Sequence, residues 1–237
     1  MPKRQEKQTI AGRLRRWLTR AVVVRVVLAV LLLPTALLLL YRLVPPPATP
    51  LMLVRLVQGE GLAKDWRPLA AISPHLPRAV IAAEDNLFCT HAGFDWPALR
   101  QQVDRALAGE HARGASTISM QTVKNLLLWP GRDPVRKLLE AALTPQLELL
   151  WSKRRIMEVY LNVAETGPGL YGAEAAARRY FKKPASALTR REAALIAAVL
   201  PNPRLWSPAR PTRYISQRVR IIERRIEQLG PLLDCVR

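Results

Sequence analysis

The stretch Ala79–Asp95, AVIAAEDNLFCTHAGFD, runs an apolar segment directly into two adjacent carboxylates, Glu84 and Asp85. A metal site is a weak interpretation, because these carboxylates and His91 lack the compact i, i+4 spacing of ligands on one helix face. A carboxyl that apolar neighbours partly desolvate has a raised pKa and can exchange protons near neutral pH. The stretch therefore favours acid–base chemistry by Glu84, at the end of an apolar helix.

Segments with helical periodicity and capping residues follow one another along most of the chain. The pattern predicts helices over 77–85, 95–109, 116–129, 134–143, 153–163, 172–181, 189–199 and 212–229. Asp133 before Pro134, and Thr189 before an apolar run, mark two of their N-termini. Strand signals are weak, and only 51–57 (LMLVRLV) resembles a short strand. The sequence therefore predicts a mainly α fold.

A second informative stretch is Gly114–Leu128, GASTISMQTVKNLLL. Ser116 is a natural N-cap, and the N-terminus of the following helix would attract an anion. Thr117, Gln121 and Lys124 fall at i, i+4 and i+7 and form one polar stripe that suits a sugar phosphate. An ordinary capped amphipathic helix would show the same pattern, and this stretch alone favours that simpler interpretation.

A third stretch, Asp133–Leu143, brings two cations and a carboxylate onto one helix face. Arg136 and Glu140 are spaced i, i+4, and Lys137 and Glu140 are spaced i, i+3. Such a group could bind a diphosphate, although a solvated ion-pair cluster worth a few tenths of a kcal/mol explains it equally well when taken alone. Pro145 is expected to break the helix soon after Glu140.

The N-terminal region has the pattern of a membrane anchor. Val22–Leu40 is almost entirely apolar and nearly reaches the ~20 residues that a membrane-spanning helix needs. Basic residues crowd the preceding segment, so the positive-inside rule places the N-terminus in the cytoplasm and the rest of the chain outside it. A cleaved signal peptide is the rival, but its apolar region would be shorter. We expect a basic cytoplasmic tail over 1–20, an anchor over 21–41, a proline-rich linker over 42–58 and a domain over 59–237.

The charge balance points to anionic partners. The chain has 37 Lys and Arg residues against 18 Asp and Glu residues, for a net charge of +19. A tethered basic domain outside the cytoplasm would lie against anionic lipids and hold a phosphorylated lipid, whereas nucleic acid is not expected there. Two cysteines, Cys89 and Cys235, could pair in an oxidising compartment. Two thiols so far apart in sequence are no disulfide framework, however, and we expect them to be unpaired.

Taken together, these stretches resemble the motifs of the peptidoglycan glycosyltransferases, family 51 of the glycosyltransferases. E-D-x-x-F-x-x-H-x-G-x-D matches Glu84–Asp95, and G-x-S-T-I-[TS]-x-Q followed by K-N matches Gly114–Asn125. R-K-x-x-E matches Arg136–Glu140, and K-x-x-I-x-E-x-Y-L-N matches Lys153–Asn162. E-A-A-L-x-A-A-x-L-P-x-P matches Glu192–Pro203. Because no penicillin-binding domain follows, we expect a monofunctional member of the family.

The resemblance implies a lysozyme-like helical domain, anchored in the inner membrane and facing the periplasm. It also implies an inverting reaction, in which the growing lipid-linked glycan is transferred to the 4-hydroxyl of the next lipid II. The product would be a β-1,4-linked glycan strand, with release of polyprenyl diphosphate. Glu84 matches the family's general base, and Glu140 matches a second glutamate that assists diphosphate departure or positions groups around it.

The resemblance also implies a set of substrate-binding residues. They are Asp85, Ser116, Gln121, Lys124, Asn125, Arg132, Arg136, Lys137 and Arg218. No cofactor is implied as required, and a divalent cation, Mg²⁺ or Mn²⁺, is left open. The implied partners are lipid II, the growing glycan, inner-membrane lipids and proteins of cell-wall synthesis or division.

One departure from the family pattern concerns Met120, which stands where the family often has a glutamine, so that one donor-side hydrogen bond is in doubt. Two other functions compete with the synthetic one. A lytic hydrolase of the same fold class would not need the cations around the second motif. A non-enzymatic basic module at the membrane would explain the charge but not the ordered carboxylates.

Overall fold

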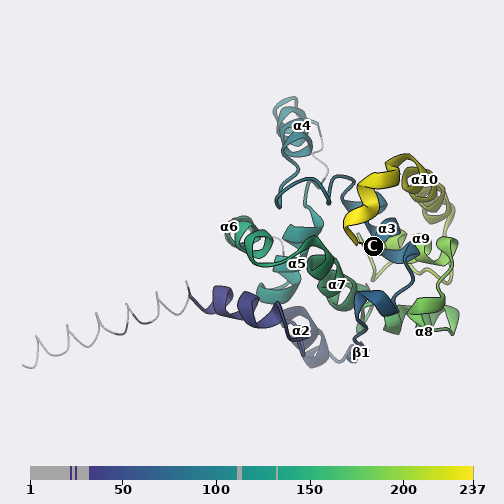
Figure 1. Ribbon diagram of the computed structural model, residues 1–237, viewed down its shortest axis with the longest axis horizontal. Coiled ribbons are helices and arrows are strands. Elements are labelled where there is room, and N and C mark those ends of the chain that lie inside the picture. Colours follow the sequence, from purple (N-terminus) through teal and green to yellow (C-terminus); the bar gives the residue numbers. More distant parts are fainter. Residues whose placement is uncertain (1–21, 23–24, 26–31, 111–113, 132, 237) are drawn as a thin grey trace, which may run out of the picture. The chain divides into compact units, whose positions relative to one another are not determined.

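The computed structural model describes residues 22, 25, 32–110, 114–131 and 133–236 (Figure 1). Contacts divide the chain into two units, Met1–Leu43 and Val44–Arg237. Most of the anchor expected over 21–41 lies outside the described residues, and residues 32–41 are helical. Among the described residues, no helix is both long and apolar enough to cross a membrane. The following description concerns the second unit.

The second unit is mainly helical, which confirms the predicted fold class. The likeness to lysozyme stays a prediction. Its α-helices are α2 (Pro50–Val57), α3 (His75–Glu84), α4 (Trp96–Leu107), α5 (Ile118–Leu127), α6 (Pro134–Leu150), α7 (Lys153–Val163), α8 (Ala173–Phe181), α9 (Arg190–Val199) and α10 (Arg213–Leu229). Short 3₁₀ helices are η1 (Leu69–Ala71), η2 (Ala185–Ala187) and η3 (Gly230–Val236).

Side-chain caps fix where most of the long helices begin. Thr117, Asp133, Ser152 and Thr212 each accept a hydrogen bond from a backbone N–H of the first turn of α5, α6, α7 and α10. Thr189 does so for α9, where Glu192 completes a capping box. Such caps satisfy orphan N–H groups and are worth about 1 kcal/mol each. The sequence therefore predicted most helix starts to within one or two residues.

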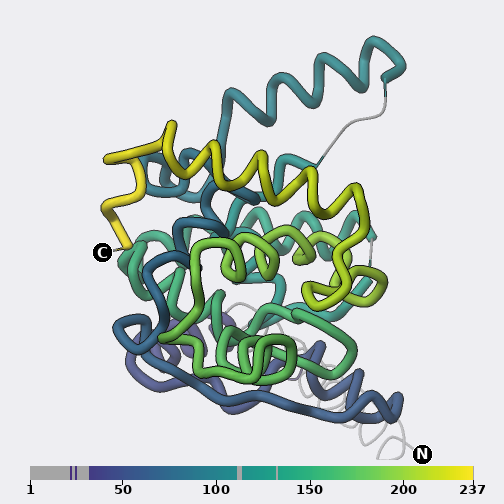
Figure 2. The backbone as a smooth tube through the Cα atoms, turned by 90° about the vertical axis from the view of Figure 1, so that its right-hand side faces the viewer, coloured from purple at the N-terminus to yellow at the C-terminus, as the bar shows by residue number. Residues whose placement is uncertain are grey.

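The core is divided between two groups of helices. In one, α3 packs against α9 and α10, and in the other α5 packs against α6 and α7. Figure 2 shows α10, in yellow, running beside these inner helices. Nearly every residue of α9 from Ala193 to Val199 is buried, as are Ala79 to Ala82 of α3. By contrast, α4 buries no residue fully and stands apart in both views. The end of α3 thus has firm support, while α4 covers little of the core.

A small three-stranded sheet joins the segments before η1 and after α7. Its strands β1 (Ala63–Lys64), β2 (Glu165–Gly167) and β3 (Leu170–Tyr171) have the order β1-β3-β2. β1 pairs with β3 in parallel, with Ala63 opposite Leu170, and β2 pairs with β3 antiparallel. After β3 the chain turns at Gly172 (φ 84°), where an added Cβ would lie 2.8 Å from the Asn162 carbonyl oxygen, so only glycine fits.

Two secondary-structure predictions were wrong. The expected strand over 51–57 is helix α2, which Thr49 caps and which begins at Pro50, so the Thr-Pro start signal outweighs the β-branched and apolar composition. Pro145 lies inside α6, which continues to Leu150. Proline removes one backbone N–H donor from the helix, but packing keeps the helix continuous. The Thr144 hydroxyl donates a hydrogen bond to the Glu140 carbonyl at 2.6 Å.

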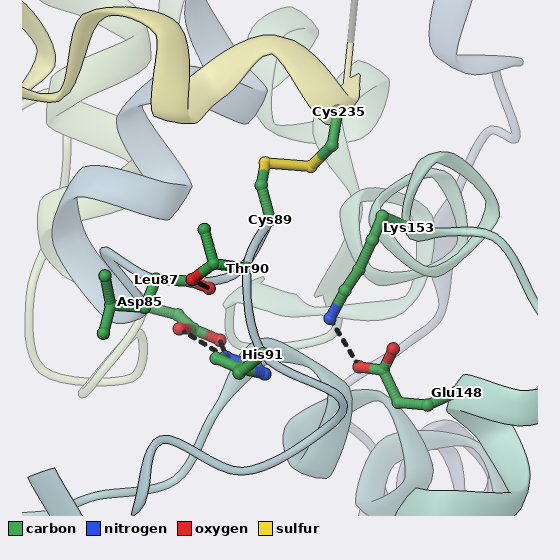
Figure 3. Close-up of a disulfide and its surroundings, with 8 residues drawn as sticks. All are labelled: Asp85, Leu87, Cys89, Thr90, His91, Glu148, Lys153 and Cys235. Carbon is green, nitrogen blue, oxygen red and sulfur yellow. Dashed lines mark hydrogen bonds and ion pairs between the residues drawn. A yellow bond between two sulfur atoms is a disulfide. The ribbon is translucent and has the colours of Figure 1, made fainter. Parts of the chain in front are cut away.

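The prediction of unpaired cysteines was also wrong, because Cys89 and Cys235 form a disulfide (Figure 3). Their Cα atoms are 5.6 Å apart, although 146 positions separate them in the sequence. The bond joins the loop after α3 to η3, near the C-terminus. Sequence spacing could not reveal this contact, because it depends on how α10 and η3 return to α3.

Candidate active site

Glu84 is the last residue of α3, and its side chain lies in a polar environment inside the unit. Only 11% of that side chain is exposed. One carboxylate oxygen accepts a hydrogen bond from the Gln121 amide at 3.0 Å, and the other lies 3.4 Å from the Arg218 guanidinium. Burial raises the pKa of Glu84, while the Gln121 hydrogen bond, Arg218 and Lys124 oppose this rise. The carboxylate is therefore a stronger base than an exposed one.

Gln121 is itself held in one orientation by Tyr160 of α7. The Tyr160 hydroxyl donates to the side-chain oxygen of Gln121 at 3.1 Å, so that the amide nitrogen faces Glu84. Tyr160 is almost fully buried, and burial together with the nearby carboxylates raises its pKa well above the usual value. The hydroxyl thus stays protonated and acts as a donor. The motifs gave Tyr160 no role of its own, although its position in the E-x-Y-L-N pattern was the available signal.

Two arginines of α10 cover the end of α3. Arg218 contacts the Ala83 carbonyl and Glu84, at 3.5 and 3.4 Å. Arg225, two turns further on, donates to the Ala82 carbonyl at 3.3 Å. These carbonyls belong to the last turn of α3, where helical carbonyls lack intrahelical donors and favour cations. Arg218 was expected from the sequence but Arg225 was not, although the seven-residue spacing on an amphipathic helix places both on the same face.

Asp85 is buried and ties three segments together. Its carboxylate accepts hydrogen bonds from the Ile118 backbone N–H at 2.9 Å and from His91 Nε2 at 2.9 Å. His91 Nδ1 accepts from the Gly93 N–H at 3.0 Å, which places the ring proton of a neutral imidazole on Nε2. The Thr117 hydroxyl donates to the Gly93 carbonyl at 2.7 Å. Asp85 therefore positions the loop after α3 against the start of α5, and its direct contact with a substrate stays a prediction.

Glu140 forms the second carboxylate centre, on α6. Its two oxygens lie 2.8 Å from the Arg136 guanidinium and 2.6 Å from the Lys137 ammonium. Glu140 and Arg136 are buried, whereas 44% of the Lys137 side chain is exposed. Lys137 also donates to the Ser116 hydroxyl at 2.7 Å. Ser116 precedes the actual N-cap, Thr117, so its hydroxyl is available to this cluster rather than to the helix.

Lys124 of α5 interacts electrostatically with both carboxylate centres. Burial lowers its pKa, and both Glu140 and Glu84 oppose this shift electrostatically. Arg136 and Lys137 lower it further, as expected for a cation among cations. Lys124 is therefore the charge that links the Glu84 centre to the Glu140 centre.

A cavity of about 520 Å³ is lined by Ala83 of α3 and by Arg218 and Arg225 of α10. Two further cavities open beside the other groups. One, of about 160 Å³, is lined by both acidic and basic side chains, among them Glu84, Asp95, Ser116 and Arg225. The other, of about 300 Å³, is mainly apolar and shares Ser116 with the first. It is also lined by Lys137, Met120 and Phe94. The apolar cavity is therefore suited to a hydrocarbon chain, and Ser116 lies where the two cavities meet.

The remaining predicted site residues have varied positions. Asn125 lies on the buried face of α5, and Met120, although almost fully buried, lines the apolar cavity. Arg132 lies outside the described residues. Among the described residues, no group of three or more His, Cys, Asp and Glu side chains could hold a metal ion.

Comparison with known proteins assigns the chain to a family. The family model described as Transglycosylase matches residues 52–227, which include every group described above. The chain belongs to the transglycosylase family.

Relatives from several bacteria bear the name biosynthetic peptidoglycan transglycosylase. The protein of Rhodospirillum centenum is 59% identical over 82% of this chain and 85% of its own length. That of Caulobacter vibrioides is 48% identical over 95% of this chain and 99% of its own. That of Rhizobium johnstonii is 46% identical over 99% of this chain and 98% of its own length. The likeness therefore extends over nearly the whole length of each protein.

In this transglycosylase, the motif at Lys153–Asn162 supports the site rather than lining it. Asn162 binds both the N–H and the carbonyl of Arg67 through its side chain, each at 2.8 Å. Glu158 accepts from the Leu69 N–H at 2.8 Å and pairs with Arg155. These bonds hold the segment before α3 against α7. Within Lys153–Asn162, only Tyr160 reaches the Glu84 centre, through its hydrogen bond to Gln121.

Proposed function

We propose that this enzyme polymerises lipid II into β-1,4-linked glycan strands and releases polyprenyl diphosphate. The family and the names of its relatives support the general activity, peptidoglycan glycosyl transfer. The observation that carries the finer proposal is the pairing of two different carboxylate centres across one cation. Glu84 has few charge partners and a raised pKa, whereas Glu140 is fixed between two cations, and Lys124 interacts electrostatically with both carboxylates.

Glu84 acts as the general base on the acceptor sugar. Its carboxylate takes the proton of the acceptor 4-hydroxyl while that oxygen attacks the anomeric carbon of the donor. Burial makes the carboxylate a stronger base than an exposed one, and the Gln121 amide holds the other oxygen in place. Attack from the face opposite the leaving group inverts the anomeric centre.

The cations stabilise the diphosphate as its bond to the anomeric carbon breaks. Lys124, Lys137 and the Ser116 hydroxyl supply donors for its oxygens. Preorganised charges of this kind act on the charge that develops in the transition state and need little reorganisation. The mainly apolar cavity beside Lys137 suits the first part of the donor's lipid chain.

Glu140 positions these cations rather than moving a proton. Both of its oxygens already accept from Arg136 and Lys137, and it is almost fully buried. Arg136 is likewise buried, and it orients Glu140. A divalent cation, Mg²⁺ or Mn²⁺, stays a prediction, and it would bind chiefly through diphosphate oxygens, because Glu140 is occupied. No step proposed here depends on it.

The reaction implies a place in the cell envelope. We propose an inner-membrane protein with a cytoplasmic N-terminus and a periplasmic catalytic domain, because lipid II is presented to polymerases at that surface. The strongly positive chain would bind anionic lipids, and cell-wall synthesis or division proteins would be its partners.

Purified full-length protein with labelled lipid II tests the proposal. We expect a polymer that lysozyme degrades, together with free polyprenyl diphosphate. The same protein should leave preformed glycan uncut. Cleavage of glycan without polymerisation would instead identify a lytic enzyme, and lipid binding without turnover would identify a non-enzymatic module.

A further inference from the structure

The largest of the three cavities near Glu84 lies along α10, the yellow helix of Figure 2. It has a volume of about 520 Å³, and all of its lining residues except Ala83 belong to α10. Two of them, Arg218 and Arg225, are arginines, and none of the described residues that line it is acidic. This α10 cavity is therefore positively charged and suited to an anionic group.

The α10 cavity begins beside the catalytic base. Arg218 lies 3.4 Å from a Glu84 oxygen, and Ala83 and Arg225 line both the α10 cavity and the 160 Å³ cavity that contains Glu84. The apolar cavity meets the Glu84 cavity at Ser116 but shares no described lining residue with the α10 cavity. A ligand that occupies all three would therefore pass Glu84 between its part in the apolar cavity and its part in the α10 cavity.

Both arginines keep hydrogen-bond donors for a ligand. A guanidinium carries five N–H donors in a planar fork. Within the described part of the chain, Arg218 reaches Ala83 and Glu84 only through Nη2, at 3.5 and 3.4 Å, and Arg225 reaches the Ala82 carbonyl only through Nη1, at 3.3 Å. A charge-assisted bond to a carboxylate has a length of about 2.7–2.9 Å. An anion in the α10 cavity would thus make closer contacts than the protein itself supplies.

The other lining residues suit a peptide. Tyr214 and Ile221 are 56% and 41% exposed and offer apolar surface to a ligand, and the Tyr214 ring packs against Trp206 with 5.4 Å between ring centres. Gln217 is exposed, and its amide can both donate and accept hydrogen bonds, as peptide groups require. A ligand with methyl groups, amides and carboxylates would match this lining.

The substrate of the proposed reaction has two kinds of anionic group. Lipid II carries a diphosphate, and the sugar next to that diphosphate bears a short peptide whose carboxylates supply the other negative charges. Lys124, Lys137 and Ser116 serve the diphosphate. We propose that the α10 cavity binds the peptide of lipid II, through carboxylates that pair with Arg218 and Arg225. The proposal rests on the proposed function, because it adds a binding site for another part of the same substrate.

Peptide binding would hold the reacting sugar beside Glu84. The peptide is attached to the sugar whose anomeric carbon is attacked, so a peptide fixed next to Arg218 keeps that carbon close to the base. The contact exists before the reaction as well as during it. It should therefore act mainly on KM rather than on kcat.

The experiment compares two lipid II substrates, one with its peptide intact and one in which an uncharged methylamide replaces the peptide. Full-length protein is assayed with each, and kcat and KM are measured separately. Because a hydrogen bond to a charged group contributes enough for roughly a tenfold change in affinity, we expect kcat/KM to be about 10-fold lower for the neutral lipid II, mainly through KM.

Two variants and a matched control locate the effect. Arg225→Gln removes a positive charge from the cavity, and Gln217→Glu adds a negative charge to it at an exposed position, where the fold should tolerate the change. Both should abolish the preference for the intact peptide, by lowering kcat/KM for that substrate while leaving the neutral one nearly unaffected. Arg220→Gln changes the net charge of α10 by the same amount as Arg225→Gln, but Arg220 is exposed outside the cavity, so the preference should persist.

Equal use of the two lipids by the wild type would overturn the proposal. So would a preference that survives both Arg225→Gln and Gln217→Glu, or one that Arg220→Gln also abolishes. An equal loss with both lipids in the cavity variants would overturn it too, since the occupant would be a part that both lipids share, such as the diphosphate of the acceptor. If the wild type polymerises neither lipid, the proposed function fails. The affinity of the protein for the two lipids then decides this proposal separately: tighter binding of the intact lipid supports it, and equal binding overturns it.

Discussion

The side-chain amide of Gln121 donates a hydrogen bond to Glu84, with 3.0 Å between Nε2 and Oε2, and Tyr160 donates to the other end of the same amide. This relay joins α7, α5 and α3. It fixes the orientation of a carboxyl whose pKa is raised by burial. A carboxylate of raised pKa that is held in one orientation accepts the proton of a hydroxyl more readily than an exposed carboxylate does, because it is the stronger base.

Replacing Tyr160 by Phe should lower kcat without unfolding the protein. The change removes the hydroxyl that orients Gln121, and a neutral hydrogen bond contributes about 0.5–1.5 kcal/mol, so we expect a roughly 2- to 10-fold loss. Tyr171→Phe is the matched control, because the Tyr171 hydroxyl is also buried but has no hydrogen-bond partner among the described residues. Equal losses in both variants would show that the relay does not matter.

The pH dependence of the reaction should follow Glu84. Its pKa is raised chiefly by burial, so kcat/KM should rise with pH through a limb above the ordinary carboxyl range. Arg218 lowers this pKa, and Arg218→Ala should therefore move the limb to still higher pH. Measuring kcat/KM from acidic to neutral pH checks both statements. A limb that moves to lower pH in Arg218→Ala would contradict the assigned contact.

The stability of the folded protein should also depend on Glu84, but it should fall with rising pH where kcat/KM rises. The folded protein holds the Glu84 proton more tightly than the unfolded chain, so the free energy of unfolding falls as pH rises from the unfolded to the folded pKa. Glu84→Gln cannot ionise and escapes this loss. Chemical denaturation at neutral pH should find the variant at least as stable as the wild type. A large loss of stability in Glu84→Gln would show that the interactions of the Glu84 carboxylate outweigh the cost of burying it.

Lys124 and Arg136 should differ, although the motifs alone predict for both that donor use suffers more than folding. Among the described residues, the Lys124 side chain has no hydrogen bond or ion pair, and burial lowers its pKa, so Lys124→Ala should weaken donor use with little loss of stability. Arg136→Ala leaves buried Glu140 with Lys137 alone, which should cost up to about 3 kcal/mol. Melting curves beside donor KM values test this contrast, and an Arg136→Ala protein as stable as Lys124→Ala would refute it.

Asp85→Asn should act on the fold of the loop more than on the chemistry. The carboxylate accepts from both Ile118 and His91, and an amide would turn an N–H₂ group toward one of these donors. An unsatisfied buried donor costs about 1–3 kcal/mol. We therefore expect a lowered melting temperature with a smaller fall in kcat than Glu84→Gln gives. A stable Asp85→Asn variant with a larger kcat defect than Glu84→Gln would contradict this role.

Local signals were sufficient for most of the helices, because caps such as Thr189 with Glu192 and Asp133 before Pro134 act within one turn. They failed where distant packing decides. Pro145 stays helical because α6 packs against α5 and against the loop after α3, where an added Cβ at Gly93 would lie 2.7 Å from the Thr144 methyl group. The Cys89–Cys235 bond depends on the return path of α10 and η3, which no local pattern contains.

The candidate site could be predicted in part. Motif positions identified Glu84, Gln121, Lys124 and Glu140, and the structure brings the residues of three separate stretches together. The motifs could not separate groups that face the cavities from groups that support them. Asp85 holds the loop after α3 through hydrogen bonds with Ile118 and His91, and its expected contact with substrate stays a prediction. Tyr160 and Arg225 were missed because each resembles a core or surface position of an amphipathic helix. Only three-dimensional contacts distinguish these roles.

The most direct measurement is the rate of lipid II polymerisation by purified, folded Glu84→Gln protein. Glutamine preserves the shape of the side chain and can still accept from Gln121, so circular dichroism and melting should resemble the wild type. It cannot accept the proton of the acceptor hydroxyl, and loss of a general base usually costs about 10²–10⁴ in rate. We predict a fall of that size in kcat with intact lipid II binding. A folded Glu84→Gln protein that polymerises lipid II at the wild-type rate would show that Glu84 is not the base.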